Sequence, residues 1–119
     1  MKPLIIVDSD RIQSVRLDFE AGRVDRKLLA RLYRPYADVG DVDQFVNDAS
    51  RSFPEGNCGL ASLYLRHLLK MGDIVQGRYG PHSHTFLKIG DDIIDITADQ
   101  FGGPRTYVGL IMKPWSVES

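Results

Sequence analysis

The fold of this protein is decided by residues 56–72, which read GNCGLASLYLRHLLKMG. Apolar side chains recur there at helical spacing, at Ala61, Tyr64, Leu65 and Leu68. This spacing predicts an α-helix with one buried face. Asn57 is a favoured N-cap residue, and Gly72 suits the left-handed residue that often follows a helix. The stretch therefore predicts a helix whose first residue is Cys58.

The first position of a helix has a chemical consequence for a cysteine. Free backbone N–H groups and the positive end of the helix dipole favour an anion at this position. A thiolate is such an anion, and cysteines at helix N-termini can have pKa values of about 3.5–7.5. The side chain of Asn57 or the backbone N–H of Cys58 can then donate to the oxyanion of a tetrahedral intermediate. Cys58 is therefore a candidate nucleophile, and the remaining question is which residue is its base.

The composition narrows the classes of protein that need to be considered. A chain of 119 residues with 43% hydrophobic residues is sufficient for one domain, which we expect to span residues 1–119. The formal net charge is −1 and no basic run occurs, so nucleic-acid binding has no electrostatic support.

The cellular compartment is indicated only by weak signals. A single cysteine cannot form an internal disulfide, and no apolar run is long enough to span a membrane. The apolar run Leu4–Val7 is too short for the core of a signal peptide. We therefore expect a cytoplasmic protein of bacterial type.

The rest of the chain divides into a helical half and a strand-rich half. Before the cysteine, the patterns predict strands at Leu4–Val7 and Ser14–Glu20 and helices at Val24–Tyr33 and Val42–Ser50, the second capped by Asp41. After Gly72 they predict strands at Ile74–Tyr79, His82–Ile89, Asp92–Thr97 and Thr106–Met112. The expected class is α+β, with the cysteine helix packed on an antiparallel sheet.

Two histidines lie on one predicted strand and are candidates for the base. His82 and His84 point to the same side of the sheet, because side chains alternate along a strand. A two-residue turn at Gly90-Asp91 would place His84 opposite Thr97. Asp95 then becomes the diagonal neighbour of His84 on the same face, where a carboxylate can orient an imidazole.

Other pairings remain open on the residues alone. In the same register His82 lies opposite Asp99, and a one-residue slip would remove both pairs. His67 is excluded as the base, because nine residues along a helix place it about 13.5 Å from Cys58 and on the opposite face.

The order of three short motifs resembles a known family. Gly56-Asn57-Cys58 opens a helix, His84-Thr85-Phe86 lies on a strand, and Asp95-Ile96-Thr97 lies on the next strand. This order is similar to that of the transglutaminase-like branch of the papain-like cysteine enzymes, whose core is a helix packed on an antiparallel sheet. The resemblance covers about residues 54–100.

The resemblance implies a site and an activity. It implies that Cys58 is the nucleophile, His84 the base and Asp95 the orienting carboxylate of a cysteine peptidase or glutamine amidohydrolase that acts on a peptide or protein without a cofactor. Asn57, Gly59 and His82 are assigned to oxyanion or substrate binding, with Gly59 in the acyl-binding groove, where the family often has an aromatic residue.

Two other functions compete with this hypothesis. His82 and His84, with Asp95, Asp99 or Cys58, include the residue types that bind zinc. A papain-like module that binds a peptide without cleaving it would show the same residues. The sequence leaves the substrate, the acyl acceptor and the oligomeric state undefined.

Overall fold

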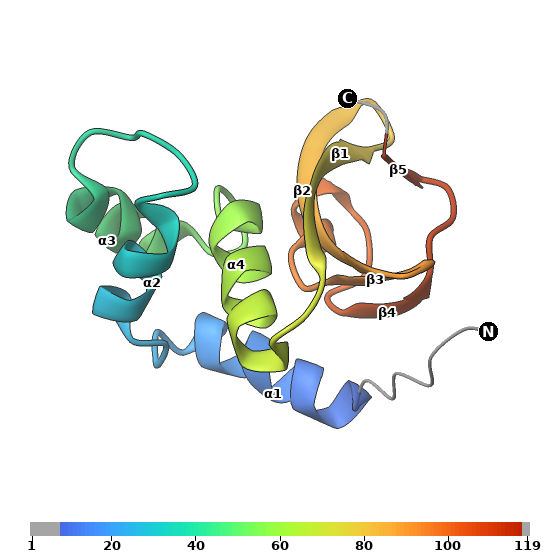
Figure 1. Cartoon of the computed structure of the whole chain (residues 1–119), viewed down its shortest axis with the longest axis horizontal. Helices are drawn as coiled ribbons and strands as arrows, with labels where there is room; N and C mark the ends of the chain where they lie inside the picture. Colours follow the sequence, from blue (N-terminus) through green and yellow to red (C-terminus); the bar gives the residue numbers. More distant parts are fainter. Residues whose placement is uncertain (1–7, 118–119) are drawn as a thin grey trace.

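The helix that begins at Cys58 lies at the centre of the fold, between two other helices and a sheet (Figure 1). The structure is a computed structural model that describes residues 8–117. Within this range the helices are α1 (Ser9–Glu20), α2 (Arg26–Tyr33), α3 (Val42–Ser52) and α4 (Cys58–Leu69), with a 3₁₀ helix η1 (Ala98–Phe101). The strands are β1 (Asp73–Tyr79), β2 (His82–Ile89), β3 (Asp92–Asp95), β4 (Tyr107–Leu110) and β5 (Trp115–Ser116).

The strands form one curled antiparallel sheet in the order β4-β3-β2-β1-β5. Leu87 faces Ile94 across the β2–β3 pair, as the turn at Gly90-Asp91 predicts. Gly90 has a φ of +61°, the left-handed conformation that a primed two-residue turn requires at this position. The predicted register of this hairpin is therefore confirmed, and it decides which side chains of β2 and β3 share a face.

The two faces of the sheet bury different clusters of side chains. Leu87 and Ile94 belong to the main core, which the sheet shares with the helices. Phe86 and Ile93, one position earlier on each strand, pack on the opposite face with Trp115. Both faces are covered, which explains why β2 and β3 contain consecutive apolar residues.

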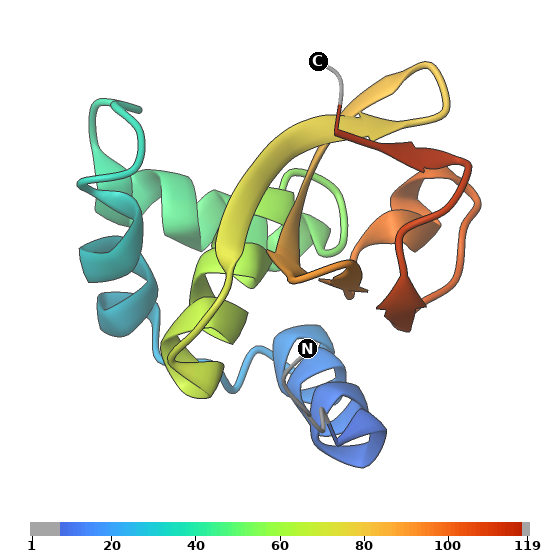
Figure 2. The same cartoon turned by 45° about the vertical axis from the view of Figure 1, so that its right-hand side comes forward.

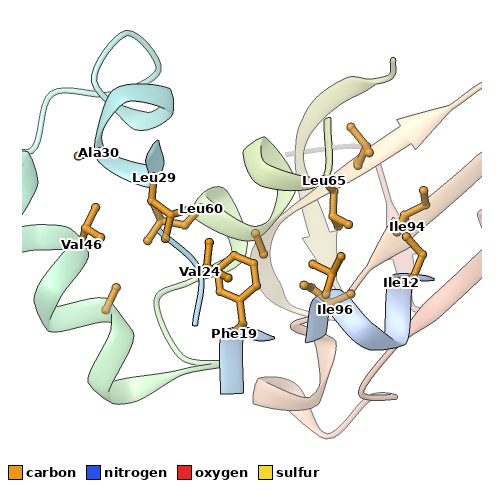
Figure 3. Packing of buried hydrophobic residues seen from close by; sticks show 14 of the residues in the cluster. Ile12, Phe19, Val24, Leu29, Ala30, Val46, Leu60, Leu65, Ile94 and Ile96 are labelled. Atoms are coloured by element: carbon orange, nitrogen blue, oxygen red, sulfur yellow. The ribbon is translucent and has the colours of Figure 1, made fainter. Parts of the chain in front are cut away.

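Helix α4 joins the two halves of the main core. Figure 3 shows Leu60 of α4 beside Leu29 of α2, on the helical side, and Leu65 on the side toward the sheet. Leu60 and Leu65 are each 1% exposed. Because α4 is buried on two sides, its first residue is held between the helical layer and the sheet.

The strand predicted at Ser14–Glu20 is wrong, because this segment belongs to helix α1. Val15, Leu17 and Phe19 alternate as in a strand, but Leu17 is 51% exposed. The buried positions Ile12, Val15, Arg16 and Phe19 follow a helical period instead. The carboxylate of Asp8 accepts a hydrogen bond from the N–H of Asp10 and begins the helix.

Most other predicted elements are confirmed, with shifted ends. Asp25 and Asp41 cap α2 and α3 through their side chains, as expected for Asp41. Helix α4 begins at Cys58 but ends earlier than predicted, because Lys70 and not Gly72 is the left-handed C-cap. Gly72 is still needed, since a Cβ there would lie 2.8 Å from Leu87 Cδ1. Helix η1 and strand β5 were not predicted, and the strand expected at Leu4–Val7 lies outside the described residues.

Candidate active site

Cys58 is placed by the loop that precedes α4. Asn57 occupies the N-cap position but makes no capping hydrogen bond with its side chain, contrary to expectation. Its Nδ2 instead donates to the carbonyl oxygens of Ala49 and Glu55, both at 2.9 Å. Asn57 is 2% exposed. Both hydrogen bonds of its amide group go to α3 and to the loop before α4, so the backbone N–H of Cys58 becomes the candidate oxyanion donor.

The structure brings His84 and Asp95 together on one face of the sheet. The Nε2 atom of His84 lies 2.6 Å from Oδ2 of Asp95. Their side chains are 0% and 1% exposed. Leu87 pairs with Ile94, so the next position along the hairpin sets Phe86 opposite Asp95. His84 lies two residues before Phe86 and is therefore the diagonal neighbour of Asp95.

The carboxylate of Asp95 is fixed through both oxygens. Oδ1 accepts hydrogen bonds from the backbone N–H of Thr97 at 2.9 Å and from its hydroxyl at 3.3 Å. Oδ2 accepts from His84 and also from Nε1 of Trp115 at 2.8 Å. Trp115 was missed at the sequence level, where the only signal was that a buried tryptophan needs a partner for its N–H.

Cys58 is partly exposed and, with Asp95, is one of the two side chains that raise the pKa of His84. Burial raises the pKa of the Cys58 thiol, but His84 and the backbone and hydroxyl of Thr85 outweigh it, so the thiol pKa is lowered. Burial lowers the pKa of His84, but Asp95 and then Cys58 raise it to about 9. Both directions favour the thiolate–imidazolium form of the pair over the neutral form.

The contact between the sulfur and the imidazole is loose. The Nδ1 atom of His84 is buried and has no hydrogen-bond partner of standard geometry among residues 8–117. Cys58 and His84 nevertheless line the same cleft, and Cys58 contributes to the raised pKa of His84. Because Nε2 is bonded to Asp95, Nδ1 is the nitrogen left for Cys58. Catalytic hydrogen bonds are often long in the absence of substrate and shorten when it binds. We therefore interpret Cys58 and His84 as a pair whose hydrogen bond forms fully only with substrate.

A cleft of about 350 Å³ opens beside Cys58 and is lined by Cys58, Gln76, Gly77, Ser83, His84 and Thr85. Within residues 8–117, no aspartate, glutamate, lysine or arginine lines it. Its size is sufficient for a short peptide segment or an amide side chain. The nucleophile candidate is therefore accessible to a substrate.

Gly59 allows two tyrosines to approach the helix next to Cys58. A Cβ on Gly59 would lie 3.2 Å from Cε1 of Tyr33 and 3.6 Å from Cε2 of Tyr36. The hydroxyl of Tyr36 accepts a hydrogen bond from Nε2 of Gln76 at 2.8 Å. Aromatic rings from elsewhere in the chain thus pack at the position where the resembling family often has an aromatic residue.

His82 lies apart from the His84–Asp95 pair. It is exposed and stacks on Phe101, with ring centroids 4.5 Å apart and planes at 6°. Phe101 in turn lies edge-on to His84 at 5.2 Å. The alternative pair of His82 with Asp99 is wrong, because η1 takes Asp99 out of the strand, and Arg16 binds its carboxylate at 2.7 and 2.8 Å.

Metal-ligand clusters and membrane-spanning helices are both absent from residues 8–117. Among the described residues, no group of three or more histidine, cysteine, aspartate or glutamate side chains is arranged to hold a metal ion. The zinc hypothesis therefore has no ligand set in this part of the chain. None of the helices between residues 8 and 117 is long and apolar enough to cross a bilayer.

The Cys58–His84 pair predicts how the free energy of unfolding varies with pH. In the unfolded chain, histidine titrates near about 6.5 and cysteine near about 8.5. Stability from the lowered pKa of Cys58 is lost as pH falls, and stability from the raised pKa of His84 is lost as pH rises through about 9. A thiolate–imidazolium pair holds one proton when folded, on His84, and between about pH 6.5 and 8.5 the unfolded chain also holds one, on Cys58. We therefore expect a plateau there, with decreasing stability on both sides.

Urea unfolding at a series of pH values checks this plateau. The contribution of the pair is the difference between the wild type and a Cys58→Ala/His84→Ala double variant at each pH. A difference that changes steadily through the plateau would contradict a thiolate–imidazolium pair.

Comparison of the chain with protein-family models, with curated proteins and with solved structures found no match. The structure shows an α+β protein with a partly exposed thiol at a helix N-terminus and a buried histidine–carboxylate pair.

Proposed function

We propose that this chain is a cysteine-dependent acyl-transfer enzyme with Cys58 as the nucleophile. The observation that carries the proposal is the convergence of three segments. A thiol at the start of α4 borders an accessible cleft, and its histidine partner is held at 2.6 Å by a buried carboxylate. Thiol-mediated acyl transfer requires a nucleophile, a base and a group that orients the base, and Cys58, His84 and Asp95 have the chemistry for these three parts.

The architecture supports a papain-like or transglutaminase-like core as part of this proposal. The cysteine helix packs on β2 and β3, and the histidine and the carboxylate come from these adjacent strands. The helix, the histidine strand and the aspartate strand follow one another in the order of that family.

In the proposed mechanism, the Cys58 thiolate attacks an amide carbonyl carbon in the cleft. The carbonyl oxygen becomes an oxyanion, which the N–H groups at the start of α4 stabilise. The His84 imidazolium then gives its proton to the departing amine through Nδ1, and the carbon–nitrogen bond breaks. Asp95 keeps the other ring nitrogen, Nε2, protonated and in place.

Water resolves the resulting thioester in the second half of the reaction. Neutral His84 takes a proton from water as it attacks, and the thiolate leaves with the carboxylic acid as product. The amide belongs to a peptide bond or to a glutamine side chain of a peptide or protein. The chemistry needs a reduced thiol, which the cytoplasm maintains.

The proposal is tested by acylating the protein with p-nitrophenyl acetate at pH 6.5. We expect one p-nitrophenolate per chain to be released rapidly and the mass of one acetyl group to be gained and then lost by hydrolysis. Cys58 is the only cysteine, so a thioester adduct can form only there. Cys58→Ala should give no adduct.

The same protein unfolded in urea provides the matched control for thiol reactivity. An unpaired thiol is only about 1% ionised at pH 6.5 if its pKa is about 8.5. The folded protein should react about tenfold faster or more, after allowance for the lower nucleophilicity of a low-pKa thiolate. Equal or slower reaction in the folded state, or an adduct that never hydrolyses, would contradict an acyl-transfer enzyme.

A further inference from the structure

The last strand of the described chain reaches the catalytic pair. Strand β5 has two residues and pairs with β1 through Tyr79↔Trp115 and Arg78↔Ser116. In Figure 2 the dark red segment near the C-terminus meets the yellow strand β1. A strand of two residues adds few hydrogen bonds to the sheet. We therefore look to its side chains for the contacts that hold β5 on β1.

Trp115 is held in one orientation by two tyrosines. Its ring stacks on Tyr107 with centroids 4.4 Å apart, and it meets Tyr79 edge-on at 5.0 Å. Trp115 is 6% exposed. The indole N–H is therefore directed by packing on both sides and has little freedom to turn away from Asp95.

Gly77 makes room for this arrangement. It faces His84 across the β1–β2 pair. A Cβ on Gly77 would lie 2.2 Å from the carbonyl oxygen of Ser116, which no side chain permits. The absence of a side chain beside the catalytic histidine thus allows β5 to approach β1.

The indole N–H and the imidazole share one oxygen of Asp95. His84 Nε2 lies 2.6 Å from Oδ2 and Trp115 Nε1 lies 2.8 Å from it. The two bonds to Thr97 hold only Oδ1. Without the indole, a small rotation of the carboxyl group would move Oδ2 away from the histidine.

We propose that Trp115 is a positioning residue of the site, which holds Oδ2 of Asp95 where it orients His84. The proposal rests on the proposed function, and it means that the site is complete only when β5 is docked on β1. Trp115 acts through Asp95 and does not touch the sulfur or the substrate.

The effect of Trp115 on His84 can be separated from the effects of the other ionisable groups around the imidazole. Cys58 comes from α4, Asp95 from β3 and Tyr79 from β1, and His82 lies behind the Phe101 ring. Of these, only Asp95 accepts a hydrogen bond from the indole. A change at the indole N–H therefore reaches Cys58 through the carboxylate and the imidazole.

The test is the pH dependence of Cys58 alkylation by iodoacetamide in the full chain. Trp115→Phe removes the N–H and part of the ring. Because Trp115 is the only tryptophan, a tryptophan auxotroph can also replace it with 3-benzothienylalanine, which keeps the bicyclic shape and lacks only the N–H. Tyr107→Phe is the matched control, since it removes an aromatic donor of the same cluster that bonds to Leu110 and not to Asp95.

If Oδ2 of Asp95 moves away from His84, the imidazolium is less stabilised and the Cys58 thiolate forms at higher pH. Both replacements of Trp115 should therefore raise the pH at which the alkylation rate begins to increase, its acid-side inflection, by about half a unit or more, and lower the rate at pH 6.5 about threefold to tenfold. Tyr107→Phe should leave the inflection unchanged. A loss of stability alone would not move the inflection, and urea titration measures that loss separately.

Three outcomes separate the two proposals. A wild-type inflection near that of a free thiol would overturn both the proposed function and this role. An acid-shifted wild-type inflection that the benzothienyl analogue leaves in place would overturn only the role of Trp115. An equal shift in Tyr107→Phe would also overturn it, because the effect would then belong to the aromatic packing.

Discussion

Replacing His84 by alanine is expected to lower the rate of acyl transfer through Cys58 by about 10³-fold, within the range for loss of a general acid–base group. The variant loses the base that generates the thiolate and the acid that protonates the leaving amine. It also loses the positive charge that lowers the pKa of the thiol. The measurement is the rate of acetyl-thioester formation and hydrolysis at pH 6.5.

Two other histidine variants give this experiment its controls. His67→Ala changes an exposed residue of α4, on the part of the helix away from Cys58, and should leave the rate within about twofold of the wild type. His82→Ala tests the alternative base on the same strand. A large loss in His82→Ala together with a small loss in His84→Ala would contradict the assignment of the base.

Replacing Arg16 by methionine is expected to lower the free energy of unfolding by about 2 kcal/mol, because the half-buried carboxylate of Asp99 loses its charged hydrogen bonds. Arg16 is 5% exposed and binds both oxygens of Asp99 at 2.7 and 2.8 Å. It also donates to the carbonyl oxygen of Ile96 at 2.8 Å and to Glu20 at 2.7 Å, and its guanidinium lies 4.8 Å from the Phe53 ring centre. Urea unfolding at pH 7 measures the loss.

The exposed pair of Arg23 and Asp18 provides the matched comparison. Their side chains are 62% and 42% exposed, so Arg23→Ala should cost about 0.5 kcal/mol or less. In Arg16→Met/Asp99→Leu the stranded carboxylate is removed as well, and about half of the lost stability should return. A similar loss in the single and double Arg16 variants would show that packing, not charge, explains the effect.

The Arg16 contacts also bear on the site. They tie α1 to η1, the short helix that places Phe101 against His84. Arg16 therefore acts on the site through the position of η1, which carries Phe101.

The parts of the site that depend on short stretches of chain could be predicted from the sequence. The existence of α4 follows from its apolar stripe, and its start at Cys58 was predicted correctly although the side chain of Asn57 does not cap it. The diagonal contact of His84 with Asp95 follows from the turn at Gly90-Asp91, because closing a two-residue hairpin decides the register of both strands.

Where the sequence-based predictions were wrong, a distant partner decided the outcome. The alternation in Ser14–Glu20 fits a strand, but burial of Ile12 and Arg16 against other segments makes it a helix. Asn57 has the preferences of a cap, yet the carbonyl oxygens of Ala49 and Glu55 bind its side chain. Asp99 was paired with His82, but Arg16, 83 residues away, binds it.

The sequence by itself determined the start of the cysteine helix, the helical half followed by strands, and the hairpin register that joins His84 to Asp95. Each of these depends on hydrogen bonds or side-chain periods within about a dozen residues. Only the tertiary structure decided that Cys58 lies against His84, that Trp115 donates to Asp95, and that Arg16 binds Asp99. Those contacts join segments that are far apart along the chain, and their choice of partner depends on how the helices and the curled sheet pack around α4.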